Sequence, residues 1–152
     1  VAGRSGRGKI SGQVIVQTHQ PEHPVLDQLF NQGYRSLAQQ LLSQRQQGQL
    51  PPFRALAVIR AESSCPQLAM DFLSLARQIS QQRAVSIAGI DLLGPLPALM
   101  EKRSGRYRFI LQITSANRSN LQQLLTEVAG ALEKNKKDHK LRWSIDVDPQ
   151  EL

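Results

Sequence analysis

The sequence has 152 residues, of which 40% are hydrophobic and 20% are charged, a balance typical of a folded globular protein and not of a disordered chain. The single cysteine, Cys65, excludes an internal disulfide and a cysteine-cluster zinc site built by this chain alone, and with no signal-peptide pattern it predicts a protein of the reducing cytoplasm. No apolar run approaches the roughly 20 residues of a membrane-spanning helix, and the net charge of +7 favours an anionic partner, nucleic acid ahead of a membrane.

The first third of the chain predicts one strand followed by two helices. Residues 12–18 form a short apolar run led by a glycine, which indicates a strand. Two stretches with helical spacing of leucines follow, 25–32 and 34–47, broken at Gly33 and ended by Gly48. One strand and two helices bury too little apolar surface to make a domain, so we expect them to belong to a larger one.

A regular order of strand, helix, strand, strand, helix, strand follows the prolines at 51–52. The strands are predicted over residues 53–61, 84–93, 106–114 and 141–147. Apolar side chains at helical spacing predict the helices over 68–79 and 121–132, and residues 94–105, rich in glycine, proline and charge, predict a loop. This order is that of the split βαβ, or ferredoxin-like, fold, an α+β sandwich in which a four-stranded antiparallel sheet carries two helices on one face.

Several short motifs resemble those of the PriA replication-restart helicases, the primosomal protein N′ family. The segment VAGRSGR at 1–7 is similar to the end of motif VI of superfamily-two helicases, and GQVIVQT, PEHP, LPPF, LGPLPA, RYRF and DVDP follow in the family's order and spacing. The resemblance covers essentially the whole chain. It implies that residues 1–49 are the end of the second, RecA-like helicase lobe and that residues 50–152 are a C-terminal ferredoxin-like DNA-binding domain. The chain is therefore expected to be a C-terminal fragment.

The same resemblance implies that the complete protein is an ATP-dependent 3′–5′ DNA helicase that recognises abandoned replication forks and restarts replication by primosome assembly. ATP and Mg²⁺ would serve only that complete protein, and zinc would be bound in a region absent from this chain. Arg4 and Arg7 are implied to contact the γ-phosphate of ATP held by the other lobe, where guanidinium groups stabilise the charge of phosphoryl transfer. This chain has no phosphate-binding loop of its own, and we expect it to be inactive alone.

Four basic residues near the third strand of this fold are the candidate DNA-binding residues: Lys102, Arg103, Arg106 and Arg108. Arg106 and Arg108 are two apart and share one strand face, opposite Tyr107 and Phe109. Such a patch suits sequence-independent contacts to phosphates of forked or single-stranded DNA, although charge on an edge strand also prevents aggregation. With Trp143, the two aromatic residues are expected in the core and not stacked on bases.

A second basic cluster precedes the last strand, and its role is open between DNA contact and stabilisation of a helix C-terminus: Lys134, Lys136, Lys137, Lys140 and Arg142. Arg118 and Gln122 are four apart and share one helix face near a helix N-terminus, a setting that suits a carboxylate. In the family, the acidic tail of single-stranded DNA-binding protein docks near such a pair. The resemblance therefore implies that Arg118 and Gln122 bind this tail, whereas the residues alone also fit an ordinary exposed pair.

Two other functions compete with the helicase fragment. One is a stand-alone ferredoxin-like nucleic-acid-binding module, and the other is a ligand-sensing regulatory domain of the same fold, which is less favoured because no polar pocket motif is visible. The partners implied by the resemblance are DNA, the single-stranded DNA-binding protein tail and other primosome proteins, with no membrane. No metal site is expected, because Pro21 breaks any helix that would bring His19 and His23 together.

Overall fold

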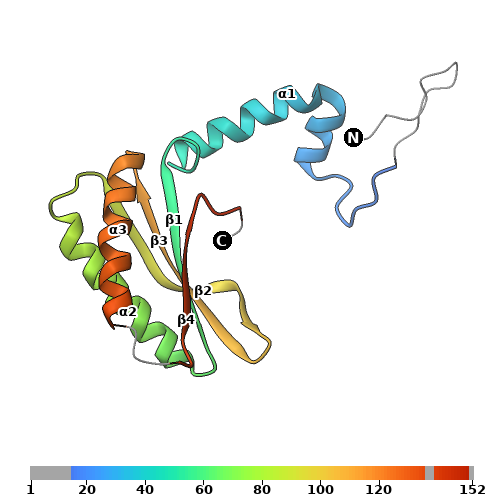
Figure 1. Ribbon diagram of the computed structural model, residues 1–152. Coiled ribbons are helices and arrows are strands. Elements are labelled where there is room, and N and C mark those ends of the chain that lie inside the picture. Colours follow the sequence, from blue (N-terminus) through green and yellow to red (C-terminus); the bar gives the residue numbers. More distant parts are fainter. Residues whose placement is uncertain (1–14, 136–138, 151–152) are drawn as a thin grey trace, which may run out of the picture. The chain divides into compact units, whose positions relative to one another are not determined.

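The C-terminal part of the chain forms an antiparallel sheet of four strands with two helices packed on one face (Figure 1). The computed structural model describes residues 15–135 and 139–150, and the chain divides into two compact units, Val1–Ser43 and Gln44–Leu152. In chain order the elements are α1 Pro24–Gln47, β1 Ala55–Ser63, α2 Pro66–Ala84, β2 Ile90–Arg103, β3 Arg106–Ser115, α3 Arg118–Asn135 and β4 Arg142–Val147. The strand order β2-β3-β1-β4, with α2 and α3 as the connections between parallel strands, confirms the predicted ferredoxin-like fold.

The main core lies between α2, α3 and the face of the sheet that they cover. Alternate residues of the two central strands point into it, which is the consequence of the twofold period of a strand. Phe109 is buried there, Tyr107 and Trp143 pack against the same cluster, and the rings of Trp143 and Phe72 lie 5.6 Å apart between centroids. The expectation that these three aromatic residues belong to the core is confirmed.

The other face of the sheet, which neither α2 nor α3 covers, carries a second and smaller apolar cluster. It consists of four buried residues: Leu56, Val58, Ala98 and Ile110. Around it, the residues of β1, β3 and β4 that point to this side are mostly polar or charged. This side of the sheet is therefore where the charged residues of the strands gather.

The first unit differs from expectation in one element. Residues 15–18, the described part of the strand predicted over 12–18, are not in a strand, and that prediction is wrong there. A strand needs a neighbour to satisfy its backbone N–H and C=O groups, and the described part of this unit supplies none. The helix break predicted at Gly33 is confirmed, because this residue lies inside α1 at φ 81° and ψ 168°, outside the helical region.

The strand β2 also differs from its prediction. The segment 84–89 ends α2 and forms a turn, whereas the loop expected over 94–105 is mostly strand, because β2 runs to Arg103 and the turn is only Ser104 and Gly105. Both turn residues have positive φ, as a two-residue hairpin requires. The glycine and proline residues that suggested a loop are accommodated by two irregularities in the pairing of β2 with β3.

Candidate nucleic-acid interface

The β2–β3 hairpin brings three of the four candidate DNA-binding residues to one end of the sheet. Lys102 pairs in register with Tyr107, and Arg103 pairs with Arg106. The Lys102 ammonium lies 4.9 Å from the centroid of the Tyr107 ring, a cation–π contact that positions the charge beside the hairpin. Arg106 Nη1 donates a hydrogen bond of 3.2 Å to the carbonyl oxygen of Lys140, so the hairpin also reaches the segment that enters β4.

The fourth residue, Arg108, lies on the face of the sheet opposite α2 and α3. It stands across from Glu62 of β1, and Glu62 stands across from Arg142 of β4. The Glu62 and Arg142 side chains form an ion pair of 3.7 Å. Antiparallel pairing therefore builds a row of three charges from residues that are far apart in the sequence. Arg142 belongs to the second basic cluster of the sequence, and the fold joins it to the first.

This row borders a hollow of about 300 Å³ that we call the sheet groove. Its floor contains Ala98 and Ile110 of the second apolar cluster, and its sides are charged: Arg60, Glu62, Arg108 and Arg142. Arg60 was not predicted from the sequence as a site residue. Its position between Ile59 and Ala61, which are both buried, could have placed it on this face. The sheet groove is thus polar and mainly cationic on its rim and apolar at its base.

The carboxylates near the sheet groove neutralise only part of its positive charge. Arg60 pairs with Asp146 at 3.3 Å and Arg142 with Glu62 at 3.7 Å, and both distances are long for a charge-assisted hydrogen bond. Across residues 15–135 and 139–150, Lys102, Arg103, Arg106 and Arg108 form no ion pair with a carboxylate; this fact leaves the four charges available to an external anion. The arrangement is chemically suited to a polyanion.

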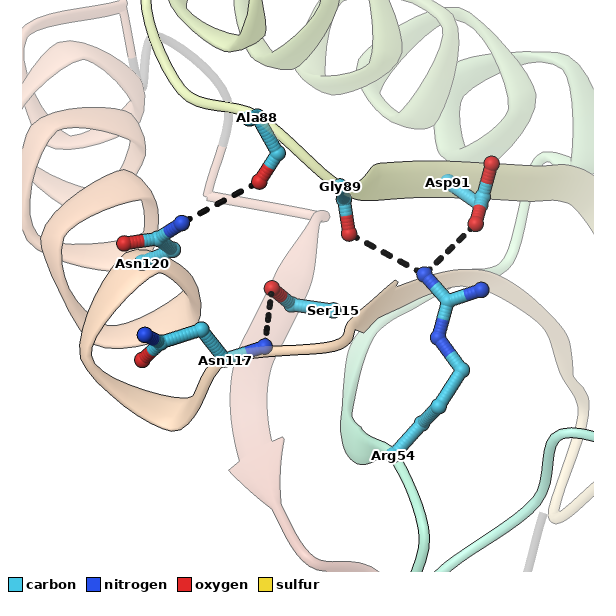
Figure 2. Close-up of polar contacts among 7 residues, drawn as sticks. All are labelled: Arg54, Ala88, Gly89, Asp91, Ser115, Asn117 and Asn120. Carbon is cyan, nitrogen blue, oxygen red and sulfur yellow. Dashed lines mark hydrogen bonds and ion pairs between the residues drawn. The ribbon is translucent and has the colours of Figure 1, made fainter. Parts of the chain in front are cut away.

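The segment that leads into β2 is tied to Arg54, the residue before β1, and to α3 (Figure 2). Arg54 Nη2 donates to the carbonyl oxygen of Gly89 at 3.0 Å and lies 2.6 Å from Asp91 Oδ2. Asn120 of α3 donates to the carbonyl oxygen of Ala88 at 3.1 Å. These contacts set the position of the first turn of α3 relative to the start of the sheet.

A second hollow, of about 500 Å³, lies beside that first turn of α3, and we call it the α3 hollow. It is lined by Pro51, Pro52, Phe53, Arg54, Ala55, Ala116, Arg118 and Asp148. Asn117 Oδ1 accepts the N–H of Ser119 at 2.8 Å, as the predicted capping region requires, and Arg118 Nη2 donates to Asp148 Oδ2 at 2.5 Å. Gln122 is exposed on α3 and does not line the hollow. The structure therefore places only Arg118 of the predicted pair in a concave site, and its pairing with Asp148 was not predicted from the sequence.

Four predicted residues lie outside the described residues: Arg4, Arg7, Lys136 and Lys137. In the part of the chain that the structure describes, no helix is long and apolar enough to cross a bilayer. Within the same ranges, no three histidine, cysteine, aspartate or glutamate side chains cluster in a way that could hold a metal ion.

Comparison with known proteins identifies the relatives of this chain. Residues 46–150 match the family model of the primosomal protein N C-terminal domain. The whole chain is 40% identical to 20% of the replication restart protein PriA of Haemophilus influenzae, and 74% of it is 31% identical to 13% of the protein of that name from Synechocystis. The chain thus spans about a fifth or less of the length of these relatives. A de novo designed protein with a ferredoxin fold aligns over 64% of this chain and 87% of its own, with 6% identity and a TM-score of 0.46.

Proposed function

This chain belongs to the PriA family of replication restart proteins, and we propose that it is the C-terminal part of an ATP-dependent DNA helicase that recognises abandoned forks and restarts replication by primosome assembly. In this proposal, Arg4 and Arg7 contact the γ-phosphate of ATP that the other lobe binds with Mg²⁺, and the zinc is held elsewhere in the complete protein. This chain alone is inactive as a helicase, and the complete protein acts in the bacterial cytoplasm with other primosome proteins.

The C-terminal unit binds DNA through the sheet groove and the β2–β3 hairpin, which we call the cationic hairpin because it carries Lys102, Arg103 and Arg106. One observation carries this part of the proposal: the fold gathers Lys102, Arg103 and Arg106 at one end of the sheet and places Arg108 in the adjoining sheet groove, and none of the four is ion-paired with a carboxylate of the described residues. Guanidinium and ammonium groups contact phosphate oxygens whatever the base sequence, and their binding releases counterions from the DNA. We therefore expect binding to forked and single-stranded DNA that weakens as salt rises.

A charge-reversal experiment tests this binding. The double variant Arg106→Glu/Arg108→Glu of the 152-residue chain should bind a fork about 30-fold more weakly, and its plot of log affinity against log salt should lose about two units of slope. The control Arg35→Glu/Arg83→Glu changes the net charge equally on α1 and α2, which contribute no residue to the hairpin or the sheet groove, and we expect an effect of about threefold or less. Equal affinities and slopes for the two double variants would place the DNA site elsewhere.

A second binding function is favoured by a separate observation, the contact of Arg118 with a carboxylate in the α3 hollow. We propose that Arg118, with Gln122 farther along α3, binds the acidic C-terminal tail of single-stranded DNA-binding protein. A guanidinium in a hollow of about 500 Å³ can bind a carboxylate from another chain with the same geometry that it uses for Asp148. Arg118→Glu should abolish this capture, and calorimetry with a tail peptide measures it.

A further inference from the structure

The pairing of β2 with β3 contains a large bulge beside the cationic hairpin. Pro97 pairs with Phe109 and Lys102 pairs with Tyr107, so the four residues 98–101 of β2 stand opposite the single residue Arg108 of β3. Extra residues in one strand bend it and redirect their side chains. Figure 1 shows β2 bowing away from the sheet before it reaches the hairpin turn.

The bulge begins with a buried residue and continues with two exposed apolar residues. Ala98 is buried with Val58 and Ile110 in the second apolar cluster. The next two residues, Leu99 and Met100, have 96% and 56% of their surface exposed. Two consecutive exposed apolar residues on an anchored bulge form a fixed projection and are not a scattered surface feature.

The surroundings of this projection indicate what it contacts. Glu101 separates it from Lys102 and Arg103 on β2, and Arg108 lies opposite it on β3. An apolar protein surface would not need several cations without carboxylate partners around the contact, whereas a nucleic acid supplies both an apolar base face and adjacent phosphates. Side chains such as leucine and methionine are used in DNA-binding proteins as wedges against base steps. The combination of apolar tip and cationic rim therefore matches an exposed base pair.

We propose that Leu99 and Met100 form an apolar wedge that packs against the terminal base pair at a DNA junction, while Lys102, Arg103 and Arg108 bind the phosphates that flank it. This inference rests on the DNA binding proposed above and assigns to it two residues that would contact the base pair at the junction. A junction presents an open base face, but in continuous duplex each face is stacked on its neighbour and insertion must first unstack it. The wedge thus favours a fork over closed duplex, whereas phosphate contacts alone do not.

The test compares a fork with a duplex that has no open end. The wedge variant is Leu99→Ser/Met100→Ser in the 152-residue chain, and the control is Val85→Ser/Leu93→Ser, which changes two exposed apolar residues outside the bulge. Affinities are measured for a fork and for a dumbbell duplex closed by loops at both ends. 2-Aminopurine in the base pair at the junction reports stacking, and circular dichroism melting checks that both variants are folded.

We expect the wedge variant to lose about tenfold in affinity for the fork and less than about twofold for the dumbbell, with the salt slope unchanged. Its 2-aminopurine signal should no longer change on binding, and the control should behave as the unchanged chain does. Equal losses on fork and dumbbell, or no loss on the fork, would overturn the wedge. The wedge would also be overturned if the wedge variant lost sedimentation with anionic phosphatidylglycerol vesicles but kept its affinity for the fork. If Arg106→Glu/Arg108→Glu weakens DNA binding while the wedge variant does not, the wedge fails and the proposed DNA binding stands.

Discussion

Arg118 and Asp148 meet at 2.5 Å across 30 residues of sequence, beside the first turn of α3. The arginine side chain is 73% exposed and the aspartate side chain 43% exposed. An internal carboxylate therefore occupies the guanidinium that we propose for the carboxylate of a partner's tail. Asp148 competes with that tail for Arg118, and the strength of the exposed pair sets how much it weakens binding.

The first prediction is that Asp148→Asn strengthens binding of an acidic tail peptide by about threefold, because it frees the Arg118 guanidinium for the peptide. The loss of this exposed ion pair should lower the free energy of unfolding by less than about 1 kcal/mol. Calorimetry with a peptide that ends in a free carboxylate measures the change. Glu127→Gln, which removes the carboxylate paired with Arg83 on the helical side, is the control and should leave the affinity unchanged. Weaker binding by Asp148→Asn would show that the aspartate assists the site and does not compete with the tail.

The second prediction concerns the charges of the sheet groove. Arg142→Glu should weaken fork binding about tenfold and reduce the salt slope by about one unit, because one phosphate contact is lost and a repulsive charge is added. Glu62→Gln should strengthen binding about twofold, since this carboxylate lies between Arg108 and Arg142. Asp71→Asn on α2 removes an equal charge from the other side of the sheet and serves as the control in the same titration. Identical results for Glu62→Gln and Asp71→Asn would remove the groove from the DNA site.

The third prediction separates two glycines by their stability effects. Gly94→Ala should destabilise the fold by about 2 kcal/mol or more, because Gly94 has φ 114° and an added Cβ would lie 2.8 Å from the carbonyl oxygen of Ile110. Gly130→Ala in α3 meets nothing within 4 Å and should stabilise the fold by about 0.5–1 kcal/mol through helix propensity. Urea denaturation of both variants measures the two free energies of unfolding. Similar values for both would contradict the close approach of β2 to β3.

The fourth prediction concerns the two arginines of the motif VI resemblance. In the complete protein, Arg4→Ala or Arg7→Ala should lower ATP hydrolysis about a thousandfold, because a guanidinium that stabilises phosphoryl transfer contributes at least that factor. Fork binding by the 152-residue chain with the same substitutions should not change, since the proposed DNA site lies in the C-terminal unit. A steady-state ATPase assay and a fork titration give the two readouts. Hydrolysis within about twofold of the unchanged protein would show that neither arginine reaches the nucleotide.

Much of the fold was predictable because its signals are local. The alternation of Tyr107, Phe109, Leu111 and Ile113 identified both the strand and its core face, and the helical spacing from Leu121 to Leu132 identified α3. Prediction failed at β2, where Gly94, Pro95 and Pro97 resemble a loop. There a paired neighbour outweighs local propensity, because β3 satisfies the backbone of β2 on both sides of each irregularity.

The candidate sites were also predictable only in part from the sequence. The sequence by itself determined the order of elements, the core faces and the presence of clustered positive charge, since these depend on spacing along one segment. Only the tertiary structure decided that Arg108, Glu62 and Arg142 form one row, that Asp148 holds Arg118, and that Leu99 projects beside the cationic hairpin. The first two relationships depend on contacts between residues 30 or more positions apart, and the third depends on the irregular register of β2 against β3; no spacing along one segment encodes either.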